Sequence, residues 1–228
     1  GTGKTAAFVL PILENLLKEN NDVKKIKVLV LSPTRELAIQ TRDTFKIFSE
    51  NTKFKCGVVL GGVNQKSQIN VLKNGIDILV ATPGRLLDLT NRHFVKLDMV
   101  NTLVLDEADT MLDMGFINDV KKIINFMPQK RQTLLFSATM AKEIAELTNK
   151  FMTDPITIKI ESNEVPTKIK QLLYYVDKEN KINLLFDILN AKDKKSTLIF
   201  TKTKHGADKL EKEFNNYNIK VSVIHGDK

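Results

Sequence analysis

Short runs of valine, isoleucine and leucine recur along this 228-residue chain, separated by amphipathic stretches of helical length. We expect strands at 27–31, 56–60, 76–80, 102–105 and 133–136, with helices at 36–51, 64–74 and 118–125 between them. Strands that are apolar throughout, and that alternate with helices, are typical of a parallel sheet covered on both faces. The sequence therefore predicts an α/β fold built on a doubly wound parallel sheet.

The pattern changes near residue 160. A polar segment containing Pro166, at 161–168, is typical of a linker. The alternation then resumes, with strands expected at 169–176, 197–201 and 221–224 and helices at 181–190 and 205–217. We therefore expect a domain at 1–160, a linker at 161–168 and an incomplete second α/β domain at 169–228. In the first helix, Pro11 is expected to introduce a kink or to loosen the first turns.

Charge and cysteine content narrow the class of protein. The 35 Lys and Arg residues outnumber the 27 Asp and Glu, and the net charge of +8 suits a polyanionic partner without identifying one. The single cysteine, Cys56, cannot form an internal disulfide, and we expect a small core residue in a reducing compartment. No apolar run reaches the ~18–20 residues of a membrane span, and no signal-peptide pattern leads the chain. These features favour a soluble, cytoplasmic protein.

Small, polar or charged residues directly follow nearly every expected strand: SPTREL, GG, ATPGR, DEAD and SAT. Ligands of doubly wound sheets bind just beyond the carboxyl ends of the strands. The sequence therefore predicts that these five segments converge on one edge of the sheet and form a binding site there.

The opening segment GTGKT has the pattern of a phosphate-binding loop that leads into a helix. Gly1, Thr2 and Gly3 would bring backbone N–H groups close to the phosphates, Lys4 would reach the β- and γ-phosphates, and the Thr5 hydroxyl would bind Mg²⁺. The full pattern begins before Gly1, and the alternative is an ordinary glycine-rich helix start.

The segment LVLDEAD ends an apolar strand in two adjacent carboxylates. Asp106 would hold Mg²⁺, often through water, and Glu107 would position and deprotonate an attacking water. The alternative is an acidic helix start, which the helix dipole also favours. Taken with GKT, the pattern predicts an ATPase in which Lys4, Thr5, Asp106 and Glu107 surround one triphosphate–metal pocket.

DEAD at 106–109 is one of seven segments by which the chain resembles the DEAD-box RNA helicases. The others follow in the family's order: PTRELA at 33–38, GG at 61–62, TPGR at 82–85, SAT at 137–139, LIFTKTK at 198–204 and HGD at 225–227. The finer resemblance is to bacterial members that remodel ribosomal and messenger RNA. The resemblance implies two RecA-like domains of the P-loop NTPase type, ATP and Mg²⁺ as cofactors, and RNA as partner.

The resemblance assigns RNA contacts to residues beyond the strand ends. These are Pro33, Thr34, Arg35, Gly61, Gly62, Thr82, Gly84 and Arg85, with Thr203, Lys204, Gly226 and Asp227 in the second domain. Such hydroxyls, cations and backbone N–H groups can hold phosphates and 2′-hydroxyls without reading bases. The alternative is that Pro33 and Pro83 only end strands, that Arg35 pairs with Glu36, and that the paired glycines form a turn.

Coupling of the ATP site to RNA opening is assigned by the resemblance to Asp109, Ser137 and Thr139, with the two hydroxyls hydrogen-bonded to Asp109. We expect His205 and His225 to be structural or surface residues, since the sequence has no Cys/His cluster for a metal other than Mg²⁺.

The family's adenine-reading and arginine-finger segments fall outside these 228 residues. We therefore expect an internal fragment of an ATP-dependent RNA helicase that hydrolyses ATP barely above background by itself. Two other functions stay open, an ATP-gated RNA clamp without unwinding and a related DNA-translocating helicase.

Overall fold

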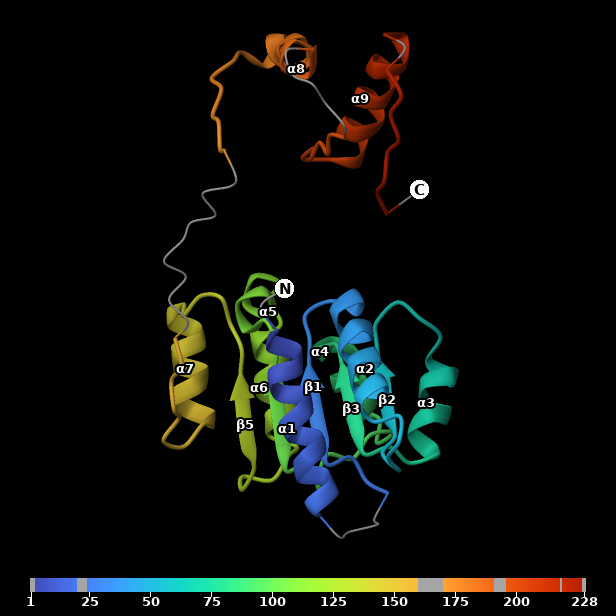
Figure 1. Cartoon of the computed structure of the whole chain (residues 1–228), viewed down its shortest axis with the longest axis vertical. Helices are drawn as coiled ribbons and strands as arrows, with labels where there is room; N and C mark the ends of the chain where they lie inside the picture. Colours follow the sequence, from blue (N-terminus) through green and yellow to red (C-terminus); the bar gives the residue numbers. More distant parts are fainter. Residues whose placement is uncertain (1–2, 20–23, 160–169, 191–195, 218, 227–228) are drawn as a thin grey trace. The chain divides into compact units, whose positions relative to one another are not determined.

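The chain divides into two units, Gly1–Ile158 and Lys159–Lys228 (Figure 1). The computed structural model describes residues 3–19, 24–159, 170–190, 196–217 and 219–226. In these ranges, no helix is both long and apolar enough to cross a membrane.

A five-stranded, fully parallel sheet forms the centre of the first unit (Figure 1). The strand order is β2-β3-β1-β4-β5. The strands are β1 (Val28–Leu31), β2 (Cys56–Val59), β3 (Ile78–Ala81), β4 (Thr102–Leu105) and β5 (Gln132–Leu135). All five strands expected in this unit are confirmed, with ends displaced by at most two residues.

In the described part of this unit, seven helices connect and cover the strands. They are α1 (Lys4–Lys18), α2 (Arg35–Phe48), α3 (Gln65–Lys73), α4 (Pro83–Asn91), α5 (Ala108–Asp113), α6 (Ile117–Ile124) and α7 (Lys142–Phe151). The three helices expected from the sequence are present, although α2 ends three residues early. Helix α1 continues through Pro11 to Lys18, so the proline does not end the helix.

Successive residues of each strand point to opposite faces of the sheet, and both faces are covered by helices. In β1, Val28 and Val30 pack in a cluster with α1 and α2, whereas Leu29 and Leu31 pack in a second cluster with α4, α5, α6 and α7. Figure 1 shows α1 and α2 on the near face and α4 and α6 behind the sheet. Burial on both faces explains why the strands are apolar throughout.

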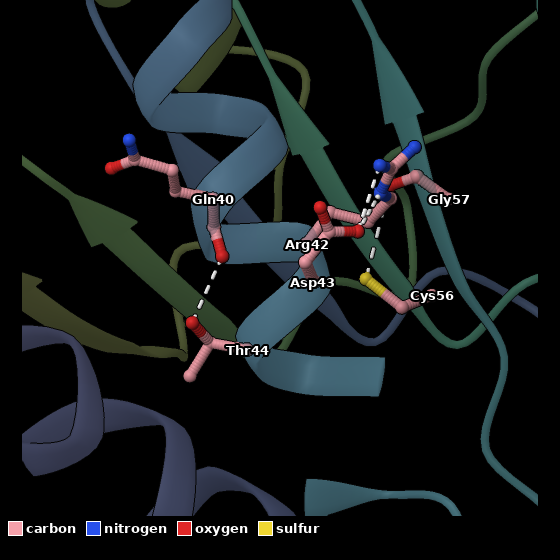
Figure 2. A network of polar contacts seen from close by, with 6 residues as sticks. All are labelled: Gln40, Arg42, Asp43, Thr44, Cys56 and Gly57. Atoms are coloured by element: carbon pink, nitrogen blue, oxygen red, sulfur yellow. Dashed lines mark hydrogen bonds and ion pairs between the residues drawn. The ribbon is translucent and has the colours of Figure 1, made fainter. Parts of the chain in front are cut away.

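The single cysteine lies on the edge strand β2, where it is half-buried beside the core rather than fully enclosed. Figure 2 shows its side chain beside Arg42 and Asp43 of α2. Its Sγ lies 3.9 Å from the Gly57 carbonyl oxygen, and the neighbouring Arg42 is paired with Asp43. Burial raises the pKa of the Cys56 thiol to about 12, although Arg42 lowers it in part. The thiol is therefore protonated at neutral pH, as expected of a packing residue.

In the second unit, the two expected helices are confirmed as α8 (Lys181–Asn190) and α9 (Lys204–Asn216). The Phe186 ring of α8 packs against Phe214 of α9, with ring centroids 5.1 Å apart. His225 Nε2 lies 3.0 Å from Asp208 Oδ1, which ties the segment after α9 to that helix.

The strands expected in the second unit are wrong for the described residues. Residues 170–176, 197–201 and 221–224 form no strand. Their apolar side chains face solvent: Tyr175 is 92% exposed, Phe200 89% and Ile224 92%. A strand needs backbone hydrogen bonds to a neighbouring strand, and these described segments form none to one another despite their β-type composition.

Candidate functional site

Four residues stand side by side just beyond the carboxyl ends of β3, β1, β4 and β5. The N–H groups of Thr82, Ser32, Asp106 and Phe136 each donate to a carbonyl of the neighbouring strand, at 2.8 to 3.0 Å. The hydrogen bonding of the sheet thus extends one residue past each strand. The alternation of side chains between the two faces of the sheet therefore extends to these four residues as well. The side chains lie on the face covered by α1 and α2, and Phe136 packs in that cluster.

Helix α1 brings Lys4 to these four residues, which we call the strand-end row: Thr82, Ser32, Asp106 and Phe136. The helix begins at Lys4 after Gly3, whose φ of 71° lies in the left-handed region that glycine tolerates. The Phe8 ring lies 5.3 Å from the Phe136 ring. Lys4 lies one turn before Phe8 on the same side of the helix. Its ammonium is close enough to Asp106 to lower the pKa of that carboxyl, so the structure brings the two residues together.

Asp106 is a buried carboxyl whose charge is only partly compensated. Its side chain is 4% exposed. Burial, and to a smaller extent the adjacent Glu107 carboxylate, raise the pKa of Asp106, Lys4 opposes both, and the net result is a pKa of about 6. A buried carboxylate whose charge is only partly compensated provides a site for a cation.

The donor set fits Mg²⁺, which prefers oxygen ligands and keeps several waters. Asp106 supplies a carboxylate, and Thr5 supplies a half-buried hydroxyl in the first turn of α1. Within the described ranges, no three His, Cys, Asp or Glu side chains could hold a metal by themselves. Phosphate oxygens and water would therefore complete the coordination. Gly1 and Thr2 lie outside the described residues.

Glu107 is held in an uncommon backbone conformation that separates its environment from that of Asp106. Its φ of 51° and ψ of 59° are left-handed, and the residue forms the N-cap of α5. A non-glycine residue costs roughly 1–2 kcal/mol in this region. Glu107 is exposed, and its Oε2 accepts a hydrogen bond from Thr110 Oγ1 at 3.2 Å. Its carboxylate is therefore accessible to water, as a general base must be.

Asp109 joins the DEAD segment to SAT. Its Oδ2 accepts hydrogen bonds from the Ala138 and Thr139 backbone N–H groups, each at 3.0 Å, and from Thr139 Oγ1 at 3.3 Å. Ser137 Oγ donates to the Thr139 carbonyl at 2.6 Å, and the Ser137 hydroxyl also contributes to lowering the pKa of Asp109. Burial alone would raise the pKa of Asp109, but the donated hydrogen bonds hold it below its usual value. The carboxylate is thus a charged anchor for SAT.

Arg35 and Gly62 bring the PTRELA and GG segments together. A Cβ on Gly62, whose φ is 72°, would lie 2.8 Å from Arg35 Nη1, so only glycine admits the guanidinium at this distance. Among the described residues, Arg35 forms neither a hydrogen bond nor an ion pair, and the alternative pairing with Glu36 is not observed. The guanidinium is exposed and available to an anion.

The GG and TPGR segments also contact each other. Thr82 Oγ1 accepts a hydrogen bond from Gly61 N–H at 3.3 Å, and Arg85 Nη1 donates to the Val63 carbonyl at 3.3 Å. Gln68 of α3 fixes the strand end before GG, because its side chain accepts from Leu60 N–H at 2.9 Å and donates to Leu60 O at 3.1 Å. The structure therefore gathers PTRELA, GG and TPGR at one place.

Several of these residues also begin helices. Thr34 is the N-cap of α2, and its Oγ1 accepts from Leu37 N–H at 3.3 Å, which leaves the hydroxyl proton free to donate. Pro33 precedes that cap, Pro83 is the first residue of α4, and Gly84 is exposed beside it. The strand-ending role of the prolines is thus present and is compatible with ligand binding.

The remaining assigned residues lie in the second unit. Thr203 is the N-cap of α9, and its Oγ1 accepts from Gly206 N–H at 3.0 Å. Lys204 begins that helix, and Gly226 is exposed in a turn. Asp227 lies outside the described residues.

Sequence reasoning missed three parts of the site: Ser32, Phe136 and the Val63 carbonyl. Ser32 and Phe136 directly follow apolar strands, as Asp106 does, and that shared position was a usable signal. The contact from Arg85 to the Val63 carbonyl had no signal, because backbone acceptors carry no sequence code.

A lysine at a helix N-terminus beside a buried aspartate at a strand end defines a RecA-like nucleotide-binding α/β unit. Residues 1–147 match the family model of the DEAD/DEAH box helicases, and the chain belongs to that family.

Curated relatives match the whole chain. It is 44% identical over 228 residues to the ATP-dependent RNA helicase CshA of Limosilactobacillus reuteri, and 42% identical over 229 residues to the RNA helicase CrhR of Synechocystis sp.. It is 39% identical over 228 residues to the DEAD-box ATP-dependent RNA helicase CshA of Bacillus subtilis. Each alignment covers 100% of this chain and 45–46% of the relative, so the chain spans about half the length of the curated relatives it matches.

Proposed function

We propose that the protein containing this chain is an ATP-dependent RNA helicase that opens short RNA duplexes locally. The single observation that carries the proposal is the continuity of one sheet edge. Asp106, beside Lys4, and Thr82, beside the GG segment, extend neighbouring parts of the same sheet with only Ser32 between them. A nucleotide bound at Asp106 and a polyanionic strand bound at Thr82 would therefore contact neighbouring residues of the same sheet edge.

On the nucleotide side, Lys4 binds the β- and γ-phosphates, and Asp106 with Thr5 orients the metal. Mg²⁺, when bound, neutralises phosphate charge. The exposed Glu107 carboxylate accepts the proton of the attacking water. Asp109, through its hydrogen bonds to Thr139, transmits the state of this segment to SAT.

On the RNA side, we propose that Arg35 pairs with a phosphate, and that the hydroxyls of Thr34 and Thr82 contact the backbone. Arg85, the exposed Gly62 and Gly84 and the half-buried Gly61 would line the path of the same strand. Contacts of this kind go to phosphates and 2′-hydroxyls, so we expect a preference for RNA over DNA with little sequence preference. The net charge of +8 supports a polyanionic partner.

We extend the proposal to the rest of the chain. Residues 169–228 would be part of a second RecA-like domain, joined by the linker at 161–168, in which Thr203, Gly226 and Asp227 complete the RNA track. Because this chain spans less than half of its relatives, we propose that these 228 residues alone hydrolyse ATP barely above background. The single cysteine fits a reducing, cytoplasmic location.

The test uses the full-length protein with Glu107→Gln and, as a matched control, Glu143→Gln at an exposed position on α7. Glu107→Gln should keep ATP and RNA affinity and lose RNA-stimulated turnover by at least about 100-fold, the scale of general base catalysis. The control should match the wild type. Equal turnover in Glu107→Gln would rule out this base.

Two further assays separate the alternatives. Equal stimulation of the ATPase by DNA and RNA of matched sequence would favour a DNA helicase. Normal RNA-stimulated hydrolysis without any opening of a short duplex would favour an ATP-gated clamp.

A further inference from the structure

A buried hydroxyl without a partner lies in the middle of the strand-end row. Ser32 is 0% exposed, and its Oγ has no hydrogen-bond partner among the described residues. Leaving a buried polar group unsatisfied costs roughly 1–3 kcal/mol, and such groups are few in native proteins. Such a group at a ligand-binding edge indicates that its partner arrives with the ligand.

Strand register places Ser32 directly between Thr82 and Asp106. Leu31 pairs with Ala81 on one side and with Leu105 on the other, so the next residue of β1 stands opposite the next residues of β3 and β4. Neighbouring strands lie about 4.8 Å apart. All three side chains lie on the α1 face, where Lys4 reaches the row.

The two neighbours of Ser32 differ in whether their polar groups already have a partner. Thr82 Oγ1 already accepts a hydrogen bond from Gly61 N–H. Asp106, by contrast, is buried, and Lys4 is the one cation that acts on it in the part of the chain that the structure describes, so the cation site lies on this side of Ser32. The hydroxyl and the carboxylate therefore face the same space under the N-terminus of α1.

We propose that Ser32 is a positioning residue for the metal: its Oγ accepts a hydrogen bond from a water bound to Mg²⁺, beside the carboxylate of Asp106. This inference rests on the proposed function, because it requires a magnesium–nucleotide complex at this edge. Ser32 touches neither the phosphates nor the attacking water, and it acts by fixing the orientation of the hydrated ion.

A second buried hydroxyl provides the matched control. Thr41 is also 0% exposed, and its Oγ1 also has no partner among the described residues. It lies on α2 between Ala38 and Phe45, both of which pack in the α1/α2 cluster, and it does not follow the end of a strand as Ser32 does. Removing this hydroxyl tests burial alone.

The experiment measures the affinity of the full-length protein for a non-hydrolysable ATP analogue, with Mg²⁺ and with EDTA, and the thermal midpoint without ligand. In Ser32→Ala, affinity should fall roughly 3- to 10-fold with Mg²⁺, the scale of one hydrogen bond, and stay unchanged in EDTA. The ligand-free midpoint should stay the same or rise. Thr41→Val should raise the midpoint without changing either affinity. Ser32→Cys, which keeps the volume but is a weak acceptor, should behave as Ser32→Ala does.

An unchanged affinity with Mg²⁺ in both Ser32 variants would overturn the inference, as would an equal loss with Mg²⁺ and with EDTA. A lower ligand-free midpoint with unchanged affinities would show that Ser32 serves the fold alone. If the wild type gains no affinity from Mg²⁺, the proposed function itself fails, and the two failures are thereby distinguished.

Discussion

Asp106→Asn should stabilise the ligand-free protein at neutral pH while abolishing ATP hydrolysis. The wild-type carboxyl has a pKa of about 6 in the folded chain against an ordinary value of 3.8. A difference of roughly two units at 1.36 kcal/mol per unit means that the charged form costs folding about 3 kcal/mol. Asparagine resembles the protonated acid in shape and carries no charge, so it removes this cost.

The pH dependence gives the sharper test. Because the pKa is raised by folding, the favourable contribution of protonated Asp106 is fully present below pH ~4 and is lost as pH rises through about 6. Asp106→Asn should therefore match the wild type near pH 4 and exceed it from pH ~7 upward. For a unit of this size, a gain of 3 kcal/mol corresponds to a thermal midpoint higher by roughly 6–12 °C.

The assay is thermal and urea unfolding of ligand-free full-length protein between pH 4 and pH 8, followed by circular dichroism. Tyrosine fluorescence does not serve for this purpose, since all three tyrosines of the chain lie after residue 170. Asp113→Asn, which removes an exposed carboxyl on α5, is the control and should change little at any pH. A gain that persists unchanged at pH 4, or no gain at pH 7.5, would refute the burial argument.

Three further outcomes are expected. Gly62→Ala should lower the thermal midpoint and weaken RNA affinity several-fold, because its Cβ would meet the Arg35 guanidinium at a positive φ, whereas Gly61→Ala points into open space and should preserve the midpoint. Asp109→Asn should weaken the RNA stimulation of the ATPase more than nucleotide affinity, both measured on the full-length protein, because it removes the charged acceptor that anchors SAT. Alkylation of Cys56 by iodoacetamide at pH 8 should be at least about 100-fold slower in the native chain than in urea, since burial raises the pKa of the thiol to about 12.

The sequence was most informative where one physical cause acted alone. A strand that is buried on both faces needs apolar residues at almost every position. The apolar runs at β1, β3 and β4 therefore predicted those strands to within two residues. The same reasoning failed at 197–201, where three successive residues are also apolar but Phe200 is 89% exposed. Strand propensity describes a fit to a sheet, and it cannot supply the neighbouring strand.

The candidate site was predictable in membership but not in detail. Polar residues at strand ends indicated one edge, and the structure brings Lys4 close to Asp106 there. The left-handed φ of Glu107 and the approach of Arg35 to Gly62 depend on backbone geometry that no residue pattern specifies. Ser32 was overlooked because a serine at a strand end is unremarkable until its burial and its missing partner are known.

The charged carboxylate of Asp106 is the common cause of the lower stability of the ligand-free protein and of the metal binding that we propose for this edge. A hydrated Mg²⁺ that neutralises Asp106 binds only the folded protein, so it stabilises by mass action and also relieves the charge cost. Asp106→Asn has no such charge to relieve. The stability advantage of the variant at pH 7.5 should therefore shrink as Mg²⁺ and a non-hydrolysable ATP analogue are added, until the wild type becomes the more stable protein. If both proteins gained the same stability from the complex, the carboxylate would not face the metal, and the assignment of this edge to a magnesium nucleotide would be wrong.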